Sequence, residues 1–179
     1  MQELHYMVVK VIGNFCGSKR NAVINRWFAK QGIKFKNINN AYIYSNIAKN
    51  EGCLIDIGEN TTISGNVELI THDNSISKCI PNVTDLFGRI KIGDNCFVGN
   101  GAIILYGVTI SDNVIIAAGS VVTASVLEEN VIVGGNPAKI IGTWNKFAKK
   151  NRDFAWNCSD YSRDDLINEL SKSERLIKR

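Results

Sequence analysis

The sequence has few of the residues on which metal and redox sites depend. Only two histidines, His5 and His72, occur in 179 residues. The five cysteines are an odd number and include no CxxC pair, which argues against a disulfide framework and against a cysteine-based zinc site. We therefore expect reduced cysteines and no bound metal.

Long apolar stretches are also missing. The most apolar windows, such as YMVVKVIGNF near the N-terminus, are short and interrupted by lysine or glycine. None approaches the ~20 residues of a membrane span, and the start lacks the basic leader and the cleavage site of a signal peptide. With 45% apolar and 21% charged residues, the chain can bury a core. We expect a soluble, cytoplasmic protein with no membrane span.

The formal net charge is only +4, and basic residues gather towards both ends of the chain. A mild excess of this kind suits either a solvated surface or the binding of an anionic small molecule such as a nucleotide phosphate. We expect no nucleic-acid partner.

A repeat of six residues dominates the middle of the chain. From Ile92 the sequence divides without a gap into IGDNCF, VGNGAI, ILYGVT, ISDNVI, IAAGSV and VTASVL. The same frame occurs earlier as IGENTT, ISGNVE and LITHDN, which begin at Ile57, Ile63 and Leu69. All nine first positions are aliphatic. The period fits neither an amphipathic helix nor the simple alternation of a strand.

A period of six fits a triangular prism. Each hexad forms one short strand and a corner, and three hexads complete one turn. The aliphatic first residue points inward and stacks on its counterpart one coil away, at the ~4.8 Å spacing of neighbouring strands. Glycine and asparagine at the corners supply unusual backbone angles. The sequence therefore predicts an all-β solenoid of parallel strands, which needs several coils and capped ends.

The two ends of the chain are predicted to be different. Residues 1–34 form an N-terminal segment, in which a helix over 19–31 caps the first coil, because apolar residues recur there at helical spacing before a glycine. Residues 35–142 form the repeat domain. Residues 143–179 form a helical tail, whose second helix begins at a cap made by Ser162 and Asp165.

His72 lies where the repeat is interrupted. Leu69 and Ile92 are 92 − 69 = 23 positions apart, which is not a multiple of six. Residues 73–88 lack the rhythm and contain a proline and a glycine, so we expect them to leave the prism as a loop. A neutral imidazole, with an ordinary pKa near ~6.5, can take up a proton and return it. We therefore predict that His72 is a general base rather than an ordinary surface histidine.

Several segments resemble one known family. The run THD before the loop, and then IGDNCFVG, AAGSVV and VGGNPAK, are similar to segments of the hexapeptide-repeat acyltransferases that acetylate galactosides, capsule sugars and exopolysaccharides. The resemblance implies a left-handed parallel β-helix and a homotrimer with composite active sites in the grooves between prisms. It also implies that His72 activates a hydroxyl of a sugar or polysaccharide precursor, and that acetyl-CoA is the co-substrate.

The resemblance extends to residues around the histidine. An aromatic residue, often tryptophan, packs beside the histidine in the family, and Phe97 stands at that position here. A backbone N–H near Asn100 would stabilise the oxyanion of the transition state. Asp73 and Asn74, at the start of the loop, are candidates for contacts with the acceptor. For Asp73 a role in starting the loop is the alternative.

The resemblance also implies a path for coenzyme A. Ala118, Gly119 and Thr123 would line the pantetheine arm, and Lys139 would lie near the phosphates. An ordinary corner glycine is the alternative reading of Gly119, and an ordinary exposed lysine is the alternative reading of Lys139.

Other functions remain open at this point. The acceptor is either a hydroxyl or the amine of a nucleotide-linked amino sugar, and an acyl group longer than acetyl is a further alternative. Outside the enzymes, the rival is a non-catalytic β-helix used for binding or assembly. A zinc enzyme of the γ-carbonic anhydrase type needs three histidine ligands, which this chain does not have. We expect Cys96 to be a core residue and His5 to be structural.

Overall fold

The computed structural model describes residues 2–49 and 51–177. These residues fall into two compact units, which divide between Gly142 and Thr143. The first unit contains the repeat, and the second contains two α-helices.

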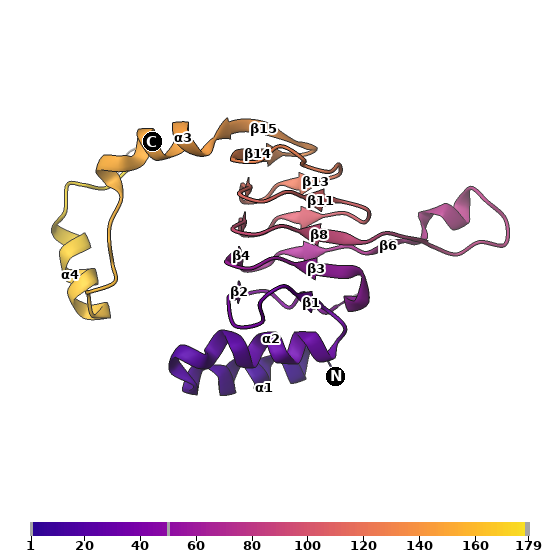
Figure 1. The fold of residues 1–179 in the computed structure, drawn as a ribbon, viewed down its shortest axis with the longest axis horizontal. Coiled ribbons are helices and arrows are strands. Elements are labelled where there is room, and N and C mark those ends of the chain that lie inside the picture. The colour runs from indigo at the N-terminus through magenta and orange to yellow at the C-terminus, as the bar shows by residue number, and fades with distance from the viewer. Residues whose placement is uncertain (1, 50, 178–179) are drawn as a thin grey trace. The chain divides into compact units, whose positions relative to one another are not determined.

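Three sheets form the body of the first unit (Figure 1). Sheet A contains β1 (Lys34–Phe35), β3 (Ile55–Ile57), β8 (Ile90–Ile92) and β11 (Thr109–Ile110). Sheet B contains β2 (Ala41–Ile43), β4 (Thr61–Ile63), β9 (Phe97–Val98), β12 (Ile115–Ile116), β14 (Val131–Gly135) and β15 (Ala138–Thr143). Sheet C contains β5 (Glu68–Leu69), β10 (Ile103–Ile104) and β13 (Val121–Val122).

The chain visits the sheets in rotation. From β3 to β13 the strands of the three sheets follow one another in the order A, B, C, so that every third strand returns to the same sheet. From β3 to β13, neighbouring strands within a sheet are parallel, for example β3 with β8 and β10 with β13. We call each round of three strands a coil. The predicted stack of short parallel strands, with helices outside it, is therefore confirmed.

The core of the coils is a column of aliphatic side chains. The register pairs Ile63 with Val98 and Val98 with Ile116, so residues of equal position in successive coils stack directly. All nine first positions of the hexads are 3% exposed or less, as predicted: Ile57, Ile63, Leu69, Ile92, Val98, Ile104, Ile110, Ile116 and Val122. Burial of this column is the main source of stability that the coils share.

Asparagines occupy one edge of the prism as a ladder. Asn60, Asn95 and Asn113 all have positive φ, between 52° and 57°, a conformation that asparagine tolerates better than most residues. The side-chain amide of Asn60 donates to Asn95 at 2.8 Å, and that of Asn95 donates to Asn113 at 2.8 Å. The corner residues of successive coils are thus joined directly.

Two helices close the N-terminal end of the coil. Helix α2 (Arg20–Lys30) is the helix predicted over 19–31, and its Ile24 and Phe28 are completely buried. Helix α1 (Gln2–Phe15), which was not predicted, packs against α2 and adds Tyr6 to an aromatic cluster with Trp27 and Phe28. The apolar window near the N-terminus is therefore a helix of the cap.

The second unit contains α3 (Trp144–Asn151) and α4 (Arg163–Lys172). The hydroxyl of Ser162 accepts a hydrogen bond from the N–H of Asp165 at 3.2 Å, which is the predicted cap of α4. The Thr143 side chain caps α3 in the same way. Among the described residues, no helix is both long enough and apolar enough to cross a membrane.

Replacing Ile90 by alanine is expected to lower the free energy of unfolding by about 2–5 kcal/mol, because the completely buried side chain would leave a cavity between coils. Its neighbour in β8, Lys91, is exposed, so Lys91→Ala is the matched control and should cost less than about 0.5 kcal/mol. Urea denaturation followed by circular dichroism measures both. Equal losses in the two variants would contradict the inward position of Ile90.

Candidate active site

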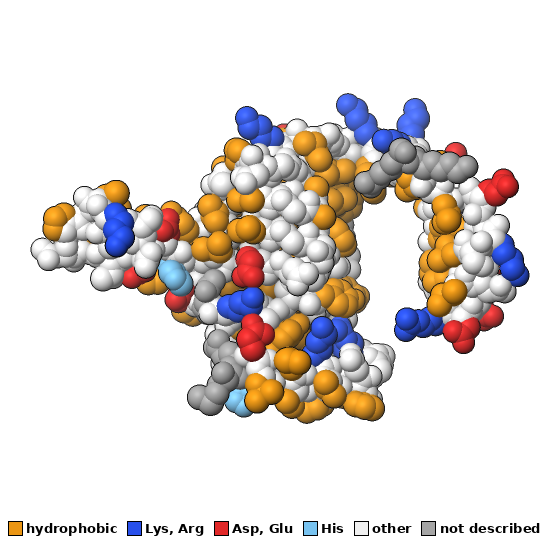
Figure 2. Space-filling model, turned by 180° about the vertical axis from the view of Figure 1, so that it is seen from behind, with side chains coloured by type: hydrophobic (Ala, Val, Ile, Leu, Met, Phe, Trp, Pro, Cys, Tyr) orange, Lys and Arg blue, Asp and Glu red, His pale blue; other side chains and the backbone are white. Residues whose placement is uncertain are grey.

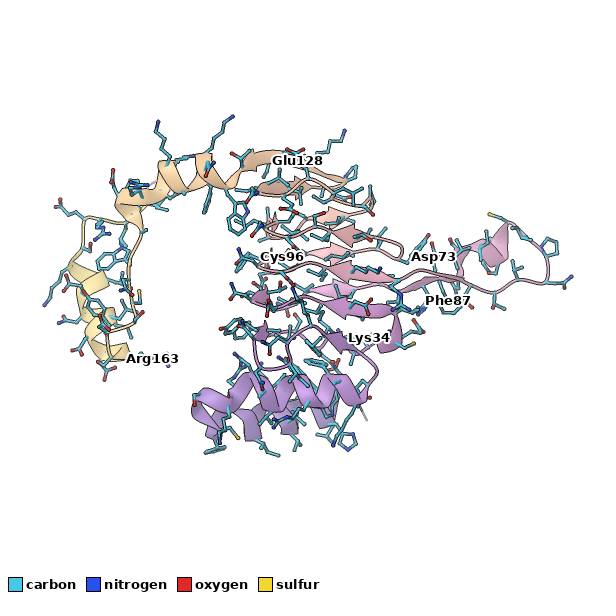
Figure 3. The ribbon with its side chains drawn as sticks, in the orientation of Figure 1. Lys34, Asp73, Phe87, Cys96, Glu128 and Arg163 are labelled. Atoms are coloured by element: carbon cyan, nitrogen blue, oxygen red, sulfur yellow. The ribbon has the colours of Figure 1, made fainter. Side chains whose placement is uncertain are left out.

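His72 stands at the base of a hairpin that leaves the coil. After β5, strand β6 (His72–Asp73) pairs antiparallel with β7 (Leu86–Phe87), and the short helix η3 (Asn74–Lys78) lies between them. The hairpin projects from the side of the stack (Figure 1), and Asp73 and Phe87 lie at its base (Figure 3). The backbone of His72 is paired with that of Phe87, yet the His72 side chain is 38% exposed.

Glu51 contacts one nitrogen of the His72 ring. Glu51 precedes β3 and His72 precedes β8, the strand stacked on β3, so the two residues share one corner in successive coils. Nδ1 of His72 lies 3.0 Å from Oε2 of Glu51. A carboxylate can only accept hydrogen bonds, so the proton of the neutral ring belongs on Nδ1. Nε2 is then left with a free lone pair, as a general base requires.

Thr71 fixes the Glu51 carboxylate in turn. The Thr71 hydroxyl donates to the same Oε2 at 2.5 Å and accepts from the backbone N–H of Glu51 at 3.3 Å. Because Thr71 is completely buried, this pairing is anchored in the coil. The Thr71 hydroxyl, and less strongly the His72 ring, lower the pKa of the Glu51 carboxyl against the opposing effect of burial. The carboxyl is therefore ionised at neutral pH.

Asp73 helps to form the hairpin. Its Oδ1 accepts the N–H of Ser75 at 2.8 Å, and its Oδ2 accepts the hydroxyl of Tyr106 at 3.1 Å. These hydrogen bonds lower the pKa of the Asp73 carboxyl, and the bond from the Ser75 backbone has the largest effect. Asn74 is exposed, and its carbonyl accepts a hydroxyl within η3 at 2.8 Å. Within this chain Asp73 thus holds the start of the hairpin, and its contact with the acceptor stays a prediction.

The aromatic ring beside His72 is Phe87. The two ring centroids are 5.9 Å apart with an interplanar angle of 48°. Phe97, which was expected beside the histidine, lies in β9 of sheet B between Thr62 and Ile115 and is 45% exposed. Within one chain Phe97 and His72 therefore belong to different parts of the prism, so the expected contact is not made there.

The residues expected along coenzyme A lie at two corners of the prism and on strand β15. Asn100, Ala118 and Gly119 stack at the corner between sheets B and C, where the Gly119 N–H donates to the Asn100 carbonyl at 2.9 Å. Thr123 is exposed and directly follows β13. It lies at the same corner of the prism as His72, two coils further along. Lys139 is exposed in β15 and lines a hollow of about 160 Å³. One chain thus brings only Thr123 to the corner of His72.

The thiol of Cys96 is part of the core, as predicted. Cys96 is 3% exposed, and its Sγ donates to the carbonyl of Ser111 at 3.1 Å. Burial raises the pKa of this thiol to about 11, so it stays protonated at neutral pH and is a poor nucleophile. In residues 2–49 and 51–177 there is no group of three or more histidine, cysteine, aspartate or glutamate residues suited to a metal ion.

Glu51, Thr71 and Phe87 were not identified from the sequence. Glu51 lies 20 positions before Thr71, whereas three complete hexads would place it 18 before. The first coil therefore falls out of the hexad frame, and alignment of repeats could not bring the two residues together. The one available signal was an acidic residue in the segment that precedes the regular repeat.

Comparison with known proteins agrees with this architecture. The sequence model described as the hexapeptide repeat of succinyl-transferase matches residues 89–124. Protein CapG of Staphylococcus aureus is 44% identical over 103 residues, which cover 56% of this chain and 59% of CapG. Galactoside O-acetyltransferase of Escherichia coli K12 is 29% identical over 158 residues, which cover 80% of this chain and 75% of that enzyme.

The fold has solved counterparts. The crystal structure of a maltose O-acetyltransferase from Clostridium difficile 630 superposes with a TM-score of 0.55 at 24% identity, covering 78% of this chain and 84% of that one. The chain spans about half the length of several curated relatives that it matches. The predicted resemblance to the hexapeptide-repeat acetyltransferases is confirmed by these matches.

Replacing Glu51 by alanine is expected to change the tautomer of His72, because the acceptor that holds the proton on Nδ1 would be lost. In the parent protein the neutral ring should carry its proton on Nδ1, and in Glu51→Ala the Nε2-protonated form should become predominant. Nitrogen-15 NMR of the imidazole side chains measures this. His5, the only other histidine, is an internal control that should not change, and an Nε2-protonated His72 in the parent would contradict the assignment.

Proposed function

We propose that this protein is an acetyltransferase that moves the acetyl group of acetyl-CoA to a hydroxyl of a sugar or polysaccharide precursor, with His72 as general base. The observation that carries the proposal is the contact between His72 Nδ1 and the ionised Glu51, which leaves Nε2 free beside an exposed hairpin. The similarity to a galactoside O-acetyltransferase and to other proteins named acetyltransferases supports this reaction class.

The proposed reaction is a direct transfer. Nε2 of His72 takes the proton of the acceptor hydroxyl as its oxygen attacks the thioester carbonyl carbon. The negative charge that develops on the carbonyl oxygen needs a donor, and the N–H of Asn100 has no acceptor within the described residues. When the carbon–sulfur bond breaks, the imidazolium returns its proton to the departing thiolate. No covalent enzyme intermediate is needed.

We propose that the coil winds left-handed and that three copies assemble. The fold shared with the maltose O-acetyltransferase supports the left-handed winding. A ring of copies needs two different contact surfaces on each copy. Sheet B presents Phe97 and Ile115 outward, and sheet C presents Ile103 and Val121, whereas sheet A presents polar residues, such as Lys91.

A composite site explains the separation of the candidate residues. In one chain His72 lies at the corner between sheets C and A, and Asn100 lies at the corner between sheets B and C. If a second copy brings its own B–C corner against the hairpin, its Phe97, Asn100 and Ala118 complete the site of the first. The pantetheine arm would then run between copies, with its phosphates near Lys139.

Replacing His72 by alanine should reduce kcat by roughly 10²–10⁴-fold, the usual contribution of a positioned general base. The side chain is partly exposed and fills no part of the core, so the free energy of unfolding should change by less than about 1 kcal/mol. Steady-state kinetics with acetyl-CoA and panels of sugar and amino-sugar acceptors provide the test. His5→Ala is the matched control and should keep parental activity, whereas an active, folded His72→Ala protein would refute the role.

Replacing Ala118 by tryptophan should weaken the binding of coenzyme A by at least about ten-fold, or 1.4 kcal/mol, because a bulky side chain would occupy the proposed groove. Ala118 is exposed, so the coil should remain folded and trimeric by analytical ultracentrifugation. Lys91→Trp, on the outer face of sheet A, is the control and should bind normally. Unchanged affinity in trimeric Ala118→Trp would argue against this path, and an active monomeric parent would argue against the composite site.

A further inference from the structure

The outer face of helix α1 is apolar. Leu4, Val8, Val11 and Phe15 recur at helical spacing and form one stripe, on the side opposite the buried Tyr6. The stripe and its flanks expose six large apolar side chains by 48% to 88%: Leu4, Met7, Val8, Val11, Ile12 and Phe15. Hydrophobic side chains are visible along the free edge of this helical cap (Figure 2). A surface helix normally has the opposite arrangement, so this patch calls for a partner.

The helical cap that carries this stripe is rich in basic residues. Residues 2–34 contain one acidic residue, Glu3, and six basic residues, which are Lys10, Lys19, Arg20, Arg26, Lys30 and Lys34. Arg26 and Lys30 of α2 line, together with Val9 of α1, an apolar hollow of about 270 Å³ between the two helices. The cap thus places cationic side chains directly beside apolar surface.

The charge of the cap decides which partner suits it. A second copy meeting this face by two-fold symmetry would place the same basic residues against one another, and like charges at such a contact repel. A nucleic acid would satisfy the charge but not the apolar stripe. An anionic bilayer satisfies both, because apolar side chains enter the boundary between headgroups and acyl chains while lysine and arginine contact lipid phosphates.

We propose that α1 and α2 form a docking surface for anionic phospholipid membranes. The stripe of Leu4, Val8, Val11 and Phe15 lies in the membrane interface, and Arg26 and Lys30 contact the phosphates. The cap closes one end of the coil (Figure 1), so docking there leaves the hairpin of His72 and the outer faces of the sheets clear of the lipid. This inference does not depend on the proposed acetyl transfer, and its test requires no activity.

Flotation of the full chain with large unilamellar vesicles provides the test. We expect binding to vesicles of phosphatidylcholine mixed with phosphatidylglycerol, much weaker binding to phosphatidylcholine alone, and a decrease as sodium chloride is added. The absence of binding to the anionic vesicles at low salt would overturn the proposal. So would equal binding to both kinds of vesicle, since the charge would then contribute nothing.

Two variants separate the apolar and the cationic contributions. Val8→Glu combined with Val11→Glu should weaken binding by more than roughly ten-fold, because the stripe can no longer enter the interface. Arg26→Gln combined with Lys30→Gln should weaken it by roughly five-fold for each charge removed. Leu127→Glu combined with Ile141→Glu adds the same charge at exposed apolar positions near the other end of the coil and should leave binding unchanged.

Measuring the oligomeric state in parallel with flotation tests whether a second copy of this chain covers the stripe instead. If the parent is a larger assembly that Val8→Glu with Val11→Glu dissociates, and if the parent does not bind vesicles, then the stripe is an interface between copies and the proposal is wrong. Circular dichroism confirms that each variant is folded. A folded Val8→Glu, Val11→Glu protein that floats like the parent would also overturn it.

Discussion

The first unit depends on the stacking of aliphatic side chains inside a triangular coil. Each hexad turns its aliphatic first residue inward, and that side chain stacks on its counterparts in the coils on either side. No coil can be stable alone, so the end coils require caps. Phe28 and Ile24 of α2 provide the N-terminal cap by the same means, burying apolar side chains against the first coil.

The candidate site uses the same stacking for a different purpose. Glu51, His72 and Tyr106 come from distant parts of the chain, yet they meet at one corner because successive coils place equivalent positions above one another. The coil supplies the rigid backbone, and the hairpin that interrupts it exposes the ring. A histidine and the carboxylate that orients it can therefore be brought together by a repeat without any local sequence motif that contains both residues.

The sequence alone was sufficient for the parts of the fold that repeat. The hexad frame predicts the period of the coil, the residues that point inward, the buried position of Cys96 and the interruption at His72. It does so because each hexad corresponds to one side of the prism. Glu51 was missed because the first coil departs from the frame by two residues. Helix α1 was missed because its apolar residues face outward, so no buried stripe and no core partner could be inferred for it.

The expected position of Phe97 shows a second limit. Phe97 was expected beside His72 from a family resemblance, but hexad spacing alone cannot tell which sheet of the prism lies beside the histidine. Contacts that form between copies leave no periodicity within one chain. The ring that one chain itself supplies, Phe87, lies in the irregular hairpin where no repeat could indicate it.

The asparagine ladder has a consequence for how this chain can vary in length. Asn95 and Asn113 are 18 residues apart and bonded amide to amide, so loss or gain of one residue between them would shift every later coil out of phase. Asn60 and Asn95, by contrast, are 35 apart and equally well bonded, because the additional residues leave the prism as the hairpin. Insertions and deletions are therefore tolerated in whole coils or at the hairpin. A new coil inserted after Asn113 would lengthen the prism by about 4.8 Å while leaving the corner of Glu51 and His72 untouched.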